Sequence, residues 1–251
     1  MLLEDRTAII YGGGGAVGSA VGRAFARQGA RVHLVGRTLG RVQRVAEEIR
    51  ACGGHAEAAE VDALDAIAVE DHADTVVERD GSLDISLNVI AYNFVQGTPF
   101  VDMTVADYEQ PVVTALRTTF LTWRAAGRHM RRQGSGVILA FGGQGAPRPD
   151  WYLGGTQTAF SVVESMRRQA ASELGRHGVR VVTLQTAGIL DTVPAAMDHR
   201  DEIIEAGLER SLLHRAATLE DVGHAAVFAA SDWGRTLTAT QLNITCGTEV
   251  D

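Results

Sequence analysis

Short runs of apolar and β-branched residues alternate along the chain with longer segments in which apolar residues recur every three or four positions. The short runs predict strands and the longer segments predict helices, because side chains repeat every 2 residues on a strand and every 3.6 on a helix. Strands are expected at 7–11, 31–35, 55–61, 83–90, 136–141, 179–185 and 240–245. Helices are expected near 16–28, 39–51, 65–79, 104–132, 156–176 and 218–231.

This alternation is typical of an α/β domain. The strand segments are almost continuously apolar, as expected of a parallel sheet that is covered by helices on both faces. Residues 1–251 contain no repeat or linker, so we expect one domain. The longest interruption is 188–217, which we expect to form a helical lid over the carboxyl ends of the strands, where open α/β sheets bind ligands.

Two helix starts carry clear capping signals. Thr104 with Asp107, and Thr218 with Asp221, have the spacing of a capping box. Pro111 falls inside the long helix, where a missing N–H and a steric clash are expected to kink the helix or restart it.

The segment 8–37 is the most informative part of the sequence. An apolar strand leads into the glycines of 12–15, then a helix follows, and then a second strand ends near Arg37. Glycines in this context let the backbone turn tightly and approach a pyrophosphate, which the helix N-terminus holds. The segment therefore predicts a dinucleotide site whose contacts include Gly12, Gly14, Gly15, Val17 and Gly18. The alternative is a glycine-rich turn with no ligand.

The end of the second strand bears on the choice of dinucleotide. An acid there hydrogen-bonds the adenosine ribose of NAD, whereas an arginine accommodates the 2′-phosphate of NADP. The sequence has Arg37 and Thr38 at this place and no acid. We therefore expect NADP, with NAD still possible. The alternative is a solvated arginine at a strand end.

Charge and composition narrow the partners and the compartment. The formal net charge is −8 and no basic stripe stands out, so nucleic acid is not expected as a partner. No apolar run approaches 18 residues and no signal peptide is recognisable, so no membrane association is expected. Cys52 and Cys246 lie far apart without further ligands at metal spacing, which predicts no metal site and suits a reducing cytoplasm.

Several motifs, taken together, resemble the short-chain dehydrogenase/reductase family from nearly one end of the chain to the other. The family's TGxxxGxG loop matches 11–18, with Tyr11 in place of Thr and Ala16 in place of the middle Gly. "LDISLNVIA" (83–91) matches its LDxLVNNAG strand, and Asn88 keeps the first Asn of that motif. "VESMRRQAASELGRHGVRVVTL" (163–184) fits a long family helix and the strand after it.

The resemblance implies a three-layer, Rossmann-type doubly wound parallel sheet of about seven strands with a nicotinamide cofactor. It implies that the helices 104–132 and 156–176 pair between subunits to form a homodimer or homotetramer. "EVDALD" (60–65) looks like the family's adenine-contacting segment, and "TAGILDT" (186–192) stands where the family has a Pro-Gly turn beside the nicotinamide. The additional cofactor contacts implied in this way are Asp62, Ala63, Asn88, Val89, Gly188 and Ile189.

The family's catalytic residues are missing from their expected positions. The family uses an Asn, a Ser, a Tyr as proton donor and a Lys that lowers the Tyr pKa. Alignment on the flanking motifs places these at Ala115, Gly143, Thr156 and Phe160 respectively. No alignment restores the Lys, because all 23 basic residues are Arg, and Arg is a poor substitute where a proton must leave.

Other side chains are candidates for the missing chemistry. Tyr152, one turn before Thr156, can donate a hydrogen bond to a carbonyl; Gln144 neighbours the vacated Ser position; and Thr156 keeps a hydroxyl. For each the alternative is ordinary loop polarity or helix capping. Weaker candidates are Tyr92 and Asn93 after the fourth strand and, on the expected lid, Asp191, Asp198, His199 and His214.

Three functions fit these observations. The first is an NADP(H)-dependent oxidoreductase that transfers hydride on a carbonyl, an alcohol or an activated C=C bond of a small or polyketide-like metabolite. The second is a pocket repurposed for a non-redox step such as cyclisation, dehydration or isomerisation. The third is a non-catalytic subunit or cofactor sensor that pairs with another chain of this fold. The complete glycine loop favours the first.

Overall fold

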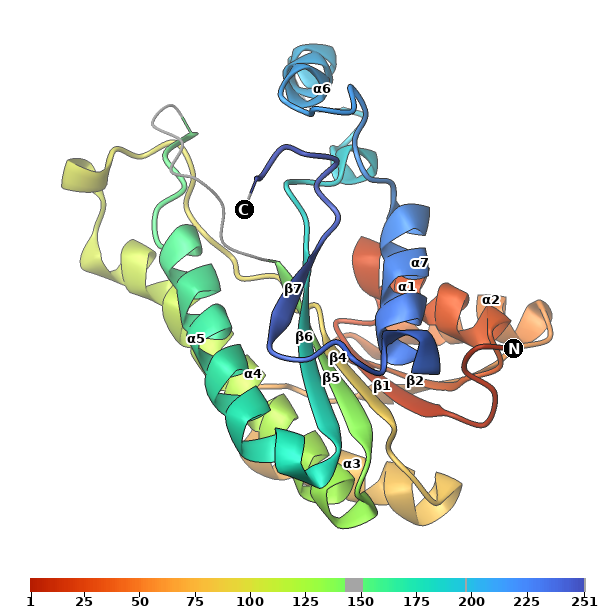
Figure 1. Ribbon diagram of the computed structural model, residues 1–251. Helices are drawn as coiled ribbons and strands as arrows, with labels where there is room; N and C mark the ends of the chain where they lie inside the picture. The colour runs from red at the N-terminus through yellow and green to blue at the C-terminus, as the bar shows by residue number, and fades with distance from the viewer. Residues whose placement is uncertain (143–150, 197, 251) are drawn as a thin grey trace.

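The computed structural model describes residues 1–142, 151–196 and 198–250. Within them the strands form one parallel sheet in the order β3-β2-β1-β4-β5-β6-β7 (Figure 1). The sheet is made of β1 (Thr7–Tyr11), β2 (Arg31–Gly36), β3 (His55–Glu60), β4 (Ile85–Asn88), β5 (Gly136–Gly142), β6 (Val179–Gln185) and β7 (Thr240–Asn243). The expected doubly wound α/β fold is confirmed. The strand order reverses between β1 and β4, which pair directly.

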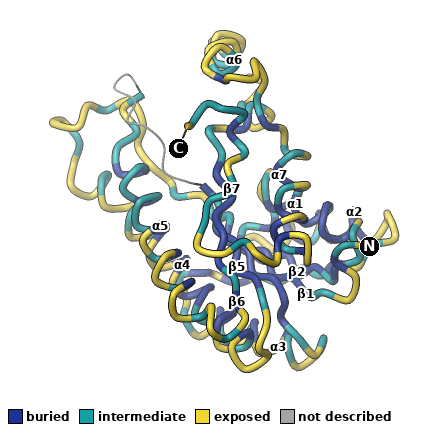
Figure 2. Tube along the Cα trace, viewed as in Figure 1, coloured by how far each residue is buried: buried dark blue, intermediate teal, exposed yellow. Residues whose placement is uncertain are grey.

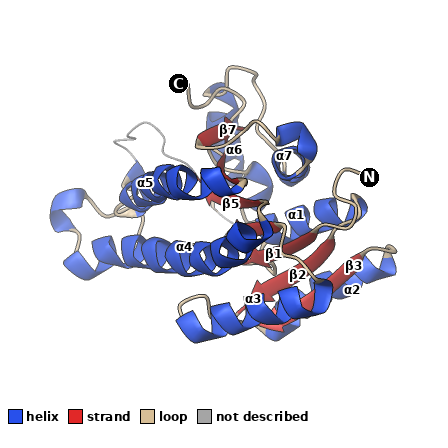
Figure 3. Cartoon of the chain, turned by 60° about the horizontal axis from the view of Figure 1, so that its bottom comes forward, coloured by secondary structure: helices blue, strands red, loops and turns tan. Residues whose placement is uncertain are grey.

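Helices cover both faces of the sheet, as Figure 3 shows. One face carries α1 (Ala16–Arg27), α2 (Leu39–Ala51) and α7 (Leu219–Ala230). The other carries α3 (Ala66–Asp80), α4 (Val105–Gln133) and α5 (Thr156–Leu174). The three-layer architecture expected from the alternating sequence is therefore present.

The inner strands β1, β2, β4, β5 and β6 are buried because both of their faces pack against helices. In β1, Ala8 and Ile10 pack toward α1 and α2, whereas Ile9 and Tyr11 pack toward α3 and α4. Figure 2 shows the buried residues concentrated along the strands and the inner helix faces. Period-2 alternation of side chains between two apolar layers explains why these strands have no polar face in the sequence.

The capping signals are confirmed, and of the two effects expected at Pro111, a kink or a restart, the restart does not occur. The Thr104 hydroxyl accepts from the Asp107 amide, and Thr218 forms a complete capping box with Asp221. The helix α4 runs without interruption through Pro111, which is buried. The Pro111 ring packs closely against Gly155, since even a single added Cβ on that glycine would lie 3.0 Å from the ring. We attribute the continuity of the helix at Pro111 to this tertiary packing.

The segment 188–217 contains a short 3-10 turn, Leu190–Thr192, and α6 (Arg200–Glu209). α6 has no buried residue and stands apart from the sheet at the top of Figure 1. None of the helices in the described part of the chain is long and apolar enough to cross a membrane.

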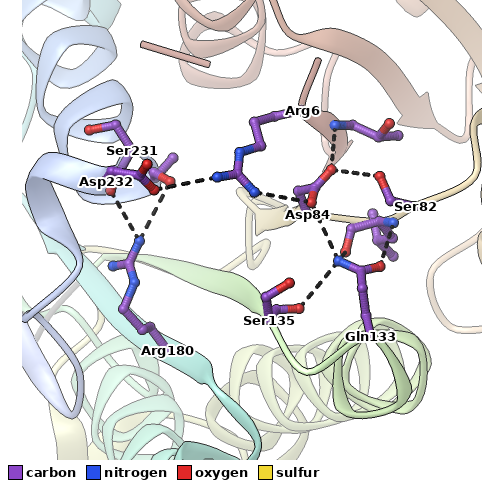
Figure 4. Close-up of polar contacts among 11 residues, drawn as sticks. Arg6, Ser82, Asp84, Gln133, Ser135, Arg180, Ser231 and Asp232 are labelled. Carbon is purple, nitrogen blue, oxygen red and sulfur yellow. Dashed lines mark hydrogen bonds and ion pairs between the residues drawn. The ribbon is translucent and has the colours of Figure 1, made fainter. Parts of the chain in front are cut away.

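A polar network joins the strands at the amino edge of the sheet (Figure 4). The Asp84 carboxylate accepts from the Thr7 amide at 2.9 Å and the Ser82 hydroxyl at 2.7 Å. Arg6 and Gln133 also donate to it, at 3.4 and 3.3 Å. Asp84 thus ties the starts of β1 and β4 to the end of α4, at the edge opposite the glycine loop.

Asp84→Asn is expected to destabilise the protein by about 2–3 kcal/mol, because it places an NH2 group against donors and removes the charge that they solvate. The matched control is Asp232→Asn. Arg6 also pairs with Asp232, but the Asp232 side chain is 81% exposed whereas that of Asp84 is 10% exposed. The control should therefore cost less than about 0.5 kcal/mol. Urea denaturation measures both, and equal losses would contradict the prediction.

Candidate functional site

A crevice opens where the strand order reverses, beyond the carboxyl ends of β1 and β4. Two adjoining cavities form it, and both are lined by Gly15, Val89, Ile90, Ala91 and Asn93. The smaller, about 390 Å³, is lined by the glycine loop and the end of β2, and we call it the loop cavity. The larger, about 700 Å³, is lined by the start of α1, the start of α5 and many rings, and we call it the aromatic cavity.

The glycine loop needs its glycines for close packing. Gly12 has φ of +86°, and a Cβ there would lie 2.9 Å from the Val89 carbonyl oxygen that follows β4. A Cβ on Gly18 would overlap the Gly12 carbonyl oxygen. The loop is thus folded tightly onto both β4 and its own helix, which brings its backbone to the floor of the crevice.

The amino end of α1 faces both cavities. Gly15 is its N-cap, no side chain caps the helix, and no acidic residue lies in its first turn. Gly15 lines both cavities, and Ala16, Val17 and Gly18 line the aromatic cavity. The partial positive charge of this helix end is therefore available to an anionic ligand.

Two arginines line the far end of the loop cavity. Arg37 follows β2 beside Thr38, and Arg41 lies in the first turn of α2. A Cβ on Gly14 would lie 2.9 Å from the Cβ of Arg41, so the stem of Arg41 packs on the glycine loop. Within the described residues neither guanidinium has a hydrogen bond or an ion pair, so both are available for an anion.

The remaining expected cofactor contacts are divided between the cavities and the core. Asp62, Ala63 and Val89 line the loop cavity, and Gly188 lines the aromatic cavity. The Asp62 carboxylate accepts from the Leu64 amide at 3.0 Å, which shapes the turn after β3.

Two of the expected cofactor contacts line neither cavity. Asn88 is buried, with its amide oxygen on the Ile90 amide and its NH2 group on Thr122. Ile189 is buried in the core. Asn88 therefore fixes the backbone of Ile90, which lines both cavities, without lining either cavity itself.

The aromatic cavity has a largely apolar wall with a few polar groups. Its rings are those of Tyr92, Phe94, Phe141, Trp151 and Phe160. Its polar side chains are those of Asn93, Thr156, Gln157, Thr186 and Glu249. Among the described residues that line it there is no Arg or His.

The start of α5 brings two of the substituted family positions into the cavity. Thr156 and Phe160, one turn apart, both line it. The Phe160 ring packs over Gly142, since a Cβ added to that glycine would lie 2.5 Å from the ring. The centroids of the Phe160 and Tyr92 rings are 6.0 Å apart. Ala115, the third of these positions, is completely buried in α4. A hydrocarbon ring thus occupies the position where a cation was expected.

The other proposed catalytic groups lie elsewhere. Tyr152 is 44% exposed, has φ of +43° and lines neither cavity. Its carbonyl oxygen accepts from the Gly97 amide. Gln144 and the Ser position, Gly143, lie outside the described residues.

Tyr92 is the phenol that does line the aromatic cavity. Its hydroxyl is hydrogen-bonded to the Thr119 side chain on α4, and burial raises its pKa to about 12. At neutral pH this phenol stays protonated and is a weak acid, although it can still donate a hydrogen bond.

The lid candidates lie outside both cavities. The Asp191 carboxylate accepts from the Leu219 amide at 2.9 Å, at the start of α7. His199 is the N-cap of α6 and lies 3.2 Å from Glu202. Asp198 and His214 are exposed. The link from this segment to the crevice is Arg210, whose guanidinium lies 4.4 Å from the Trp151 ring centroid.

Sequence reasoning missed three kinds of site residue. Arg41 could have been found, since it follows Arg37 by one helical turn. Gln157 could have been inferred from its position beside Thr156. Glu249 gave no signal, because the turn that places it is made by Asn243 and Thr245, which hydrogen-bond its backbone.

The described residues include no cluster of three or more His, Cys, Asp or Glu side chains suited to a metal ion. The available ligand groups are instead the uncapped amino ends of α1 and α5, two arginines and an apolar cavity. Such a set suits an extended organic anion with an aromatic end.

Comparisons with known proteins cover nearly the whole chain. A family model described as Enoyl-(Acyl carrier protein) reductase matches residues 14–249. L-rhamnose 1-dehydrogenase (NAD(P)(+)) from Azotobacter vinelandii is 32% identical over 264 residues, which cover 98% of each chain. D-threitol dehydrogenase from Mycolicibacterium smegmatis is 27% identical, over 92% of this chain and 87% of the relative. The crystal structure of a short chain dehydrogenase from Burkholderia cenocepacia in complex with NADP matches with a TM-score of 0.85 and 28% identity over 99% of each chain.

Proposed function

Because this chain belongs to the short-chain dehydrogenase/reductase family, we propose that it is an NADP(H)-dependent oxidoreductase. Its reaction is hydride transfer on a carbonyl, an alcohol or an activated C=C bond. The observation that carries the proposal is the pair of guanidinium groups, Arg37 and Arg41, at the loop cavity. They lie beside Thr38, and no acid follows β2.

The loop cavity fits the two anionic parts of NADP. The open amino end of α1 and the Gly12–Gly15 backbone would hold the pyrophosphate. Arg37, Arg41 and the Thr38 hydroxyl would hold the 2′-phosphate, since guanidinium forks match phosphate oxygens. The turn at Asp62 and Ala63 would border the adenine.

The nicotinamide end belongs in the aromatic cavity, beside Val17 and Gly188. When bound there, the reduced cofactor supplies the hydride. The chain's own residues exclude water with their rings and position the substrate with polar groups such as Thr156 and Gln157. The bound NADP in the Burkholderia cenocepacia structure and the NAD(P)(+) of the Azotobacter relative's name support the choice of cofactor.

The substrate class follows from the wall of the aromatic cavity. Five rings and few charged groups favour a small or polyketide-like metabolite with an apolar body over a free sugar. The relatives named for L-rhamnose and D-threitol support alcohol and carbonyl chemistry in general.

Titration of the purified protein with NADPH and with NADH, followed by cofactor fluorescence, tests the proposal. NADPH is expected to bind more tightly than NADH. If neither binds, the proposal is wrong. If NADPH binds but no member of a panel of aldehydes, ketones and enones oxidises it, a non-redox step or a cofactor-sensing role replaces it.

We also propose that two copies pair through α4 and α5. The groove between these helices is lined by Phe120, Trp123 and Met166, among others, and Phe120 is 51% exposed. Leu116 and Val113 continue this apolar face along α4. A face of this kind buries its apolar area by pairing with a second copy.

Phe120→Glu is expected to convert the assembly to smaller species, because it places a charge at the centre of an apolar contact. Ile67→Glu is the control: Ile67 is more exposed than Phe120, at 73%, but lies on α3. Sedimentation velocity measures both variants. A Phe120→Glu variant that sediments like the wild type would contradict pairing through this face.

The segment 188–217 remains the proposed lid. Its Arg210 stacks on Trp151, which lines the aromatic cavity, while no residue of α6 is buried. The free thiols of Cys52 and Cys246 suit a reducing compartment, for which we propose the cytoplasm.

A further inference from the structure

The aromatic cavity combines ring faces with a carboxylate. Among the described residues that line it, five carry aromatic rings and only Glu249 carries a charge. Burial raises the pKa of Tyr92 to about 12, so its ring stays neutral at ordinary pH. The faces of aromatic rings carry negative electrostatic potential, so rings and a carboxylate around one cavity attract an organic cation.

The C-terminal turn places Glu249 at this wall through its backbone. The Glu249 amide donates to the Thr245 hydroxyl at 3.2 Å, and the Glu249 carbonyl accepts from the Asn243 side chain at 3.0 Å. Glu249 makes a further interaction within the chain. Because the two hydrogen bonds of the turn use only the backbone of Glu249, they hold it in place without depending on the carboxylate.

Formal positive charge is absent from the described wall of the cavity. No Arg or His lines it, and Phe160 occupies the position where a cation was expected. Arg210 does not line the cavity, but its guanidinium lies 4.4 Å from the Trp151 ring centroid, so a ring of this wall already attracts one cation. The uncapped amino end of α5 presents about half a positive charge. This partial charge is smaller than the full charge of the Glu249 carboxylate.

The absence of an acid and a cation affects two kinds of hydride acceptor differently. Reduction of a carbonyl group places negative charge on its oxygen, which a nearby proton donor or cation must stabilise. Reduction of an iminium group removes a positive charge and needs neither. A lysine in place of Phe160 would repel an iminium ion, whereas the Phe160 ring attracts it.

We infer that the aromatic cavity selects a cationic iminium compound with an apolar body over a neutral carbonyl compound. The inference rests on the proposed hydride transfer and specifies its acceptor, a carbon–nitrogen double bond that is reduced to an amine. The hydride forms a C–H bond at the carbon of the C=N⁺ group, and the π electron pair moves to nitrogen and cancels its charge, with oxidation of NADPH to NADP⁺. No proton is transferred, so the step balances without the missing acid.

The residues of the wall act on the charge of the substrate. A negative potential favours the charged form of a bound group, so Glu249 and the rings keep the nitrogen of a bound imine cationic. The carbon of a cationic C=N⁺ group is a better hydride acceptor than that of a neutral imine.

The test compares two bicyclic probes of similar size. N-methyl-3,4-dihydroisoquinolinium is a permanent iminium cation, and 1-tetralone is a neutral ketone. Isothermal titration calorimetry measures their binding without cofactor, and NADPH absorbance measures their reduction. The wild type is expected to bind the iminium about tenfold more tightly than the ketone, and to reduce it with the higher kcat/KM.

Glu249→Gln removes the charge and keeps the size of the side chain. We expect the iminium to bind about tenfold more weakly and the ketone to bind as before, because only the iminium carries a charge. Glu220→Gln is the matched control. Its side chain is 73% exposed on α7 and does not line the cavity, so neither affinity should change.

A second pair of variants tests the same potential at another position of the wall. Phe160→Met and Phe160→Lys both remove the ring, but only the lysine adds a positive charge. Phe160→Met should weaken iminium binding about threefold, and Phe160→Lys should weaken it by about tenfold more. Ketone binding should change equally in both variants. Melting temperatures monitor the fold.

The outcomes separate this inference from the proposed function. A ketone bound as tightly as the iminium, or Glu249→Gln and Phe160→Lys variants that weaken both probes equally, would overturn the cation preference. Selective binding of the iminium without its reduction by NADPH would overturn the reaction. Selective binding in a protein that binds neither NADPH nor NADH would leave a cation site standing and overturn the oxidoreductase. Reduction of the ketone alone would leave the oxidoreductase standing and overturn this inference.

Discussion

Gly18→Ala is expected to abolish tight NADPH binding while the protein remains folded. The new methyl group would overlap the Gly12 carbonyl oxygen, so the glycine loop must move away from the start of α1. Overpacking of this kind costs about 1–3 kcal/mol, which corresponds to a loss of about tenfold to hundredfold in affinity if it falls on the bound state. Fluorescence titration with NADPH measures the loss, and circular dichroism monitors the fold.

Gly175→Ala is the matched control for this substitution. Gly175 follows α5, has an ordinary helical backbone, and a Cβ there meets nothing within 4 Å. The control should therefore bind NADPH like the wild type. If Gly18→Ala also bound like the wild type, the loop backbone would not be the pyrophosphate cradle.

The architecture could be predicted from sequence because local and long-range signals agree. The strands β1, β2 and β6 are apolar on both faces, and the structure buries them on both faces. The expected strand 83–90 shortened to Ile85–Asn88 because the Leu83 amide bonds the Gln133 side chain and the Ile90 amide bonds the Asn88 side chain. Pro111 was expected to kink the helix or restart it, and α4 continues through it without restarting while Pro111 packs beside Gly155.

The candidate site could be predicted only where backbone chemistry defines it. Gly12, Gly14 and Gly18 were recognisable because their role depends on lacking a side chain. Tyr152 shows the limit: one helical turn before Thr156 in sequence, it lies before α5 begins, with φ of +43°, and turns out of the crevice lining. The interpretation of Tyr152 depended on the helix beginning before Thr156, and α5 begins at Thr156.

The rest of the site depends on tertiary folding. The aromatic cavity gathers Phe141 from β5, Phe160 from α5 and Trp151 from the segment before α5, along with Glu249 from the C-terminal turn. No spacing in the sequence relates these positions. The loss of the expected acid and cation is readable from sequence, but the uncapped amino end of α5 appears only in three dimensions.

Arg37→Ala is expected to weaken NADPH binding strongly and to leave NADH binding unchanged. A hydrogen bond to a charged group contributes about 1.5–3 kcal/mol, so the loss should be about tenfold to hundredfold in affinity. Arg41→Ala should act in the same direction, and the double variant should lose less than the product of the two effects, because both guanidinium groups would bind one phosphate. Fluorescence titrations with each cofactor measure these changes.

A control variant and the effect of salt on cofactor affinity test whether Arg37 and Arg41 bind the 2′-phosphate. Arg44→Ala removes an exposed guanidinium from the same helix, one turn beyond Arg41 and outside the loop cavity, so it should change neither affinity. Since the 2′-phosphate contact is electrostatic and exposed, added salt should weaken NADPH binding more than NADH binding in the wild type, but equally in the double variant. If Arg37→Ala weakens NADPH and NADH by the same factor, Arg37 acts on the shared part of the cofactor, and the preference for NADP is then unsupported.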